Sequence, residues 1–160
     1  MEHKHIITAL VENKFGVLTR IAGLFSSRGY NIDSLAVGVT QDPEVSRMTI
    51  VVTGDDRIIE QVNKQLNKVI DVIKVQDLTD DAHIEGELVL MKVHCTQKTK
   101  PEIIQIVSIF NATVVDFSKK SMTLQIVGSQ DKLNAFYDLM KSFGIKDMSR
   151  TGRIALPRGD

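Results

Sequence analysis

The feature that most constrains the fold is a repetition, because one order of strands and helices is expected twice within 160 residues. In the first half, β-rich segments are expected to form strands at 4–11, 31–40, 47–52 and 69–78. The segment 17–28 has apolar residues at the spacing of one helix face, which are Leu18, Ile21, Ala22 and Phe25. Asp55 or Asp56 can cap a second helix, so the order is βαββαβ.

The polar stretch 79–83 interrupts this pattern and predicts a linker, after which the same order returns. The strands of the second half are expected at 87–95, 113–117, 122–127 and 145–149. Its helices are expected to begin near Thr99 and Ser129, and the tail 150–160 is expected to be irregular. We therefore expect one domain at 1–78 and a second at 84–160.

Two βαββαβ units predict an α+β fold of two ferredoxin-like sandwiches, each an antiparallel sheet with helices on one face. The other face of each sheet is expected to be bare. Leu35, Val37 and Val39 alternate on a strand that lies at a sheet edge in this topology. Because a free apolar edge tends to aggregate, we expect this strand to pair with a second copy in a symmetric homodimer.

Charge and hydropathy exclude several classes of partner. Lys+Arg and Asp+Glu both number 20, so the chain lacks the basic field that favours nucleic acid or an anionic membrane. No apolar run approaches the roughly 20 residues that span a bilayer, and the polar segment 1–5 leads into a strand rather than a signal peptide. The single cysteine, Cys95, is expected to be a packed thiol in a reducing cytosol. We therefore expect a cytoplasmic protein.

The segment 12–31 carries the candidate binding site. Asn13 and Gly16 precede the first helix, and such a loop presents unpaired N–H groups and the positive end of the helix dipole. The N–H groups of Gly16, Val17 and Leu18 are expected to hold a small anion such as an amino-acid carboxylate. The alternative is an ordinary tight turn at Gly16. No side chain in the segment can carry out chemistry on such a ligand, which favours a sensor over a catalyst.

Two asparagines and an apolar wall complete the predicted site. Asn13 and Asn31 can each accept from an ammonium group and donate to a carboxylate. Taken alone, however, Asn13 is more typical of a turn residue whose side chain bonds to its own backbone, and Asn31 of a bend residue after Gly29. Ile32, Val17 and Leu18 are near enough in sequence to form the wall, and Leu18 is also expected in the core. One methylene in such a pocket is worth about 1–3 kcal/mol, so the pattern does not distinguish valine from leucine or isoleucine.

No metal or catalytic site is expected. His3 and His5 are two apart on a strand and project on the same side, but the sequence places no third ligand beside them. His83 and His94 are isolated in the sequence. Glycine loops that hold phosphates, zinc-protease motifs and nucleophile elbows are absent from the sequence.

Three stretches between Glu12 and Ile50 are specific enough to indicate a family. They read Glu12-Asn13-x-x-Gly16-x-Leu18-x-Arg20, Gly23-Leu24-Phe25-Ser26-x-Arg28-Gly29-Tyr30-Asn31-Ile32-x-Ser34-Leu35 and Ser46-Arg47-Met48-Thr49-Ile50. The chain thereby resembles the small regulatory subunit of acetolactate synthase, also called acetohydroxyacid synthase, over nearly its whole length. Such subunits begin with an ACT domain, a βαββαβ small-molecule sensor, and carry a second domain of similar topology.

The resemblance implies a non-catalytic subunit that activates a separate catalytic subunit and confers feedback inhibition by valine. It implies no cofactor in this chain, with thiamine diphosphate, Mg²⁺ and FAD on the catalytic partner. The effector, a branched-chain amino acid, is expected between two ACT domains at Asn13, Gly16 and Asn31. A free-standing ACT sensor that regulates another enzyme of amino-acid metabolism is the alternative. A transcriptional regulator would need a DNA-binding element, which the sequence lacks. A small enzyme would need catalytic residues, and the sequence has no catalytic motif.

Overall fold

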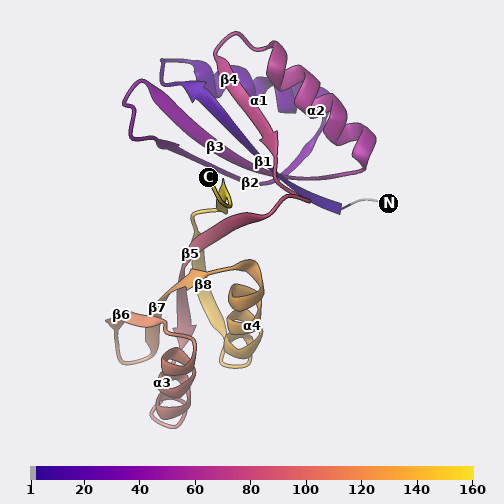
Figure 1. Cartoon of the computed structure of the whole chain (residues 1–160). Coiled ribbons are helices and arrows are strands. Elements are labelled where there is room, and N and C mark those ends of the chain that lie inside the picture. The colour runs from indigo at the N-terminus through magenta and orange to yellow at the C-terminus, as the bar shows by residue number, and fades with distance from the viewer. Residues whose placement is uncertain (1–2) are drawn as a thin grey trace. The chain divides into compact units, whose positions relative to one another are not determined.

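The protein is described by a computed structural model that covers residues 3–160 (Figure 1). These residues divide into two compact units. The first contains the residues up to Ile84 together with Arg153–Asp160, and the second contains Glu85–Gly152. Among the described residues, no helix is long and apolar enough to cross a membrane.

The first unit has the predicted βαββαβ order. Its elements are β1 (His3–Glu12), α1 (Val17–Arg28), β2 (Asn31–Val39), β3 (Val45–Gly54), α2 (Asp56–Lys68) and β4 (Val72–Asp77). The strands pair antiparallel in the order β2-β3-β1-β4, with Ile7 opposite both Ile50 and Asp77. Both helices cover the same face of this sheet (Figure 1). The strand β2 therefore lies at the sheet edge, as predicted.

The core of the first unit lies between the sheet and its helices. Alternate residues of β1 pack against both helices because successive side chains of a strand point to opposite faces. The buried residues of α1 are Val17, Ile21 and Phe25. The prediction that Leu18 and Ala22 share this face is wrong, since both are exposed. The buried face of α1 includes Ile21 and Phe25, as the predicted face did. It differs from the predicted face by a small rotation of the helix, which places Val17 rather than Leu18 against the core.

The second unit repeats the order. Its elements are β5 (His83–His94), α3 (Lys100–Ile109), β6 (Thr113–Phe117), β7 (Ser121–Gly128), α4 (Gln130–Lys141) and β8 (Ile145–Arg150). The strands follow the order β6-β7-β5-β8. Both helices contribute to a single core with β5 and β7, in which Phe136 and the thiol of Cys95 are buried. The two units confirm the predicted pair of ferredoxin-like sandwiches.

The tail is not irregular as predicted, because residues Ile154–Pro157 form a further strand, β9, that pairs with β5. Arg158 N donates to Ala82 O at 2.9 Å, which ties the tail to the first unit. Ala155 is buried against Ile6, Val51 and Leu78 on the sheet face opposite the helices. The prediction of a bare second face is therefore wrong for the first unit, since part of it is covered by the tail.

Candidate functional site

The loop between β1 and α1 has the backbone that the sequence predicts. Gly16 lies immediately before α1 with φ 86° and ψ −7°. An L side chain rarely adopts this left-handed conformation, whereas glycine adopts it at little cost. A Cβ added at Gly16 would meet Arg20 Nη1 only at 3.9 Å. The positive φ, rather than crowding, therefore requires glycine here.

Two of the three predicted N–H donors face the loop without a backbone partner. Val17 N donates to Lys14 O at 3.4 Å, and Arg20 N makes the first helical bond to Gly16 O at 3.1 Å. Within residues 3–160, the N–H groups of Gly16 and Leu18 have no backbone acceptor. Such groups at a helix start attract an anion. The N–H group of Val17 is used by the turn, so that part of the prediction is not supported.

Asn13 ties the loop to the turn between β2 and β3. Its backbone N donates to Glu44 O at 2.7 Å, and its Nδ2 donates to Pro43 O at 3.0 Å. The side chain is therefore not bonded to its own backbone, which was the alternative for this residue. In the part of the chain that the structure describes, Oδ1 of Asn13 accepts no hydrogen bond. This oxygen is free to accept from an ammonium group.

The positive charge next to the loop is already neutralised. Arg20 Nη2 lies 2.5 Å from Asp71 Oδ2, and the Asp71 side chain is only 7% exposed. Asp71 also accepts from Glu12 N through its backbone oxygen, at 2.8 Å. The loop therefore offers an anion backbone N–H groups and a helix dipole rather than an unpaired guanidinium. The sequence gives no signal for Asp71, because it reaches the loop only through the fold.

Asn31 and the loop lie at opposite ends of α1. A helix of 12 residues is about 18 Å long. Asn31 pairs with Thr53, which pairs with Lys4 at the start of β1. The loop with Asn13 and Gly16 follows the other end of β1. One copy of the chain therefore does not bring Asn31 to the loop.

The predicted apolar wall is only partly available to a ligand. Val17 is buried, and Ile32 packs against the same core. Leu18 is 47% exposed, so it is the member of the wall with free surface. Leu18 is exposed because α1 is rotated so that Val17, rather than Leu18, packs against the core.

Comparison with known proteins decides the family. The family described as AHAS small subunit-like ACT domain matches residues 7–74, and the family described as Small subunit of acetolactate synthase matches residues 86–159. A protein of Archaeoglobus fulgidus, named Probable acetolactate synthase small subunit, is 51% identical over 98% of this chain and 98% of its own. The chain belongs to the acetolactate synthase small-subunit family.

Further members of the acetolactate synthase small-subunit family support the assignment. The Acetolactate synthase small subunit of Aquifex aeolicus is 51% identical over 97% of this chain and 81% of its own length. The crystal structure of the acetolactate synthase small subunit from Thermotoga maritima has a TM-score of 0.88 and 37% identity, covering 99% of both chains. The resemblance seen in the motif at Glu12–Ile50 is thus confirmed, and the first unit is an ACT-type domain of this family.

Proposed function

We propose that the chain is a non-catalytic regulatory subunit that binds an acetolactate synthase catalytic subunit, activates it and makes it sensitive to valine. Membership of the small-subunit family and the names of the relatives support the partner. The observation that carries the effector site is the left-handed Gly16 at the start of α1, with unpaired N–H groups beside Asn13. Thiamine diphosphate, Mg²⁺ and FAD are assigned in this proposal to the catalytic subunit.

A homodimer through the edge strand β2 would complete the site. Leu35, Val37 and Val39 expose apolar surface on this strand. A two-fold axis that pairs β2 with its copy about Leu35 sets Asn31 of one copy opposite Val39 of the other. Val39 pairs with Ser46, which pairs with Val11 near the end of β1. Such a dimer would therefore bring Asn31 of the second copy to the end of the sheet that carries the loop.

The chemistry of the shared site suits a free amino acid. The ligand carboxylate would accept from the N–H groups of Gly16 and Leu18 and interact with the α1 dipole. Its ammonium group would donate to Oδ1 of Asn13 and to Asn31 of the second copy. Leu18 would contact the side chain. Because Arg20 is paired with Asp71, the site carries no unpaired guanidinium charge. This suits a zwitterionic ligand, which has no net charge.

Asn13→Ala is expected to weaken valine inhibition strongly while most of the activation persists. The variant removes the acceptor for the ammonium group, and a hydrogen bond to a charged group is worth about 1.5–3 kcal/mol. The valine concentration for half-inhibition should therefore rise by about 10-fold or more. Activity of an acetolactate synthase catalytic subunit, assayed with the purified chain over a valine series, measures both quantities.

Lys14→Ala is the matched control in the same loop, because the Lys14 side chain is exposed and, within residues 3–160, pairs only with Glu12. It should keep both activation and inhibition. Loss of both functions in Asn13→Ala would indicate misfolding, which circular dichroism detects. Unchanged inhibition in a folded Asn13→Ala variant contradicts the site. If the chain neither binds nor activates the catalytic subunit, a free-standing ACT sensor replaces the proposal.

Valine affinity is expected to change when the catalytic subunit binds. An effector shifts the packing of two ACT domains only through its different affinity for two arrangements. By linkage, the partner must change valine affinity by the same factor, typically 5–150-fold. Calorimetric titration of valine into the free chain and into the assembled complex measures this factor. Equal affinities in both titrations contradict the mechanism.

A further inference from the structure

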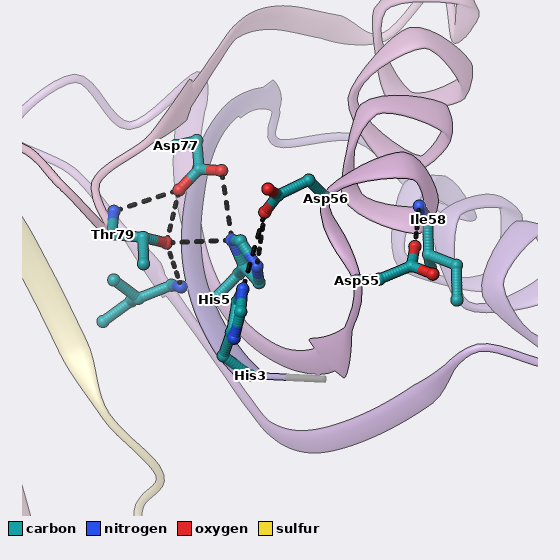
Figure 2. Close-up of polar contacts among 8 residues, drawn as sticks. His3, His5, Asp55, Asp56, Ile58, Asp77 and Thr79 are labelled. Carbon is teal, nitrogen blue, oxygen red and sulfur yellow. Dashed lines mark hydrogen bonds and ion pairs between the residues drawn. The ribbon is translucent and has the colours of Figure 1, made fainter. Parts of the chain in front are cut away.

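A histidine cluster lies at the start of β1, at the opposite end of this strand from the loop between β1 and α1. His3 and His5 project from the same side of β1, and Asp56 approaches them from the first turn of α2 (Figure 2). Asp56 Oδ1 lies 3.6 Å from His3 Nε2 and 3.8 Å from His5 Nε2. The ligand atoms of all three residues lie within 4.8 Å of one another. The structure therefore supplies the third ligand that the sequence does not place.

His5 is buried with one ring nitrogen facing the cluster. Its side chain is only 6% exposed, and its Nε2 has no hydrogen-bond partner among the described residues. Its Nδ1 lies 3.3 Å from Thr79 Oγ1 and 3.6 Å from Asp77 Oδ2 (Figure 2). A carboxylate behind the distal nitrogen is the usual support of a metal-binding histidine. Thr79 and Asp77 therefore orient the buried His5 ring.

The contacts of Thr79 determine which nitrogen of His5 carries the hydrogen. The Thr79 hydroxyl donates its one hydrogen to Asp77 Oδ1 at 2.5 Å and accepts from Ile6 N at 3.1 Å. It must therefore accept from His5 Nδ1. In the neutral ring, the Nε2 lone pair then faces Asp56 Oδ1, which is another acceptor. A cation held between these two acceptors would satisfy both of them.

Asp56 is not needed as a helix cap. Asp55 fills that role, because its Oδ1 accepts from Ile58 N at 2.9 Å (Figure 2). Asp56 is therefore free to turn its carboxylate to the two rings. Its side chain is 88% exposed, and that of His3 is 48% exposed. The open side of the cluster leaves room for water as a further ligand.

We propose that His3, His5 and Asp56 bind a divalent transition metal of the zinc class, with water in the fourth position. Two ligands about 2.1 Å from a tetrahedral zinc ion lie about 3.4 Å apart, close to the distances of Asp56 Oδ1 from the two Nε2 atoms. A site of two imidazoles and one carboxylate favours zinc, whereas calcium and magnesium prefer sites built from oxygen ligands alone. The bound ion would join the starts of β1 and α2, and through Asp77 the end of β4.

Zinc titration of the chain tests the site independently of acetolactate synthase. The chain, purified without a polyhistidine tag and stripped with a chelator, is expected to bind one Zn²⁺ per chain by calorimetry. Co²⁺ should bind at the same site and report its coordination by visible absorption. The unfolding temperature should rise with Zn²⁺, because the ion binds the folded state. Absence of Zn²⁺ binding overturns the proposal.

Variants at exposed ligands locate the bound ion without disturbing the core. His3→Ala and Asp56→Asn are each expected to lower Zn²⁺ affinity by more than about 100-fold, because loss of a second-shell partner alone costs about 10–100-fold. Asp77→Asn weakens the contact behind His5 Nδ1 and should lower Zn²⁺ affinity by about 10–100-fold. His94→Ala is the control, since His94 is an exposed histidine of the second unit. Wild-type affinity in both His3→Ala and Asp56→Asn, or loss of binding in His94→Ala, places the ion elsewhere and overturns the proposal.

Discussion

Val37→Lys is expected to convert the proposed homodimer into a monomer and to abolish valine binding. Val37 is 46% exposed on the edge strand β2, between Leu35 and Val39. In a symmetric pairing of β2 with its copy, the substitution enters the interface once from each copy, so two ammonium groups would have to leave water in an apolar strand interface. The molar mass from light scattering after size-exclusion chromatography should halve at micromolar concentration. Calorimetry should then detect no valine binding, because Asn31 of the second copy is lost.

Val115→Lys provides a matched control on the other unit. Val115 is 48% exposed on β6, which is the edge strand of the second sheet. Because the proposed interface lies on the first unit, this variant should remain a dimer that binds valine. The opposite pattern, a monomer from Val115→Lys and a dimer from Val37→Lys, would move the interface to the second unit. It would also remove the basis for a site shared through β2.

Phe25→Ala is expected to destabilise the first unit by about 3–5 kcal/mol, because truncation of a buried phenylalanine loses transfer free energy and leaves a cavity. Phe25 is 1% exposed in the core, and its ring meets that of Tyr30 edge-on with centroids 6.0 Å apart. Urea denaturation measures the loss. Phe15→Ala is the control of the same residue type, since Phe15 is fully exposed. Its effect should stay within about 0.5 kcal/mol.

A second phenylalanine separates the two units. Phe136 is fully buried in the core of the second unit. If the units unfold in separate transitions, Phe25→Ala should shift one of them and Phe136→Ala the other. A single shared transition shifted by both variants would instead indicate that the units unfold together. An effect of Phe25→Ala below about 1 kcal/mol would contradict the packing of the first core.

The strand and helix order was predictable because each element carries its own period. Alternation along β3 and the apolar stripe of α1 are local patterns, and they need no knowledge of the partner elements. The error at Leu18 has a local cause as well. The stripes that begin at Val17 and at Leu18 both contain Ile21 and Phe25, and they differ by one residue of rotation. Only the packing against the sheet decides between them.

The loop of the candidate site was predictable, while the contacts around it were not. Gly16 before a helix signals a left-handed residue, and the structure has it there. Asp71 reaches Arg20 from the segment between α2 and β4, and Asp56 reaches the histidines from the start of α2. These contacts join residues about fifty positions apart, so no spacing in the sequence encodes them. The strand β9 was missed because four residues ending in proline carry too little periodicity.

The covering of the first sheet by Ala155 has a consequence for biosynthesis. The residues Arg153–Asp160 follow the entire second unit along the chain, yet they belong to the first unit. On the ribosome, Ile6 and Val51 therefore emerge long before the segment that shields them. The first unit can form its helix-covered core early, but its other face stays open until synthesis has passed the second unit. The second unit is in effect an insertion into the first, so the first unit is completed only after the second has been synthesised.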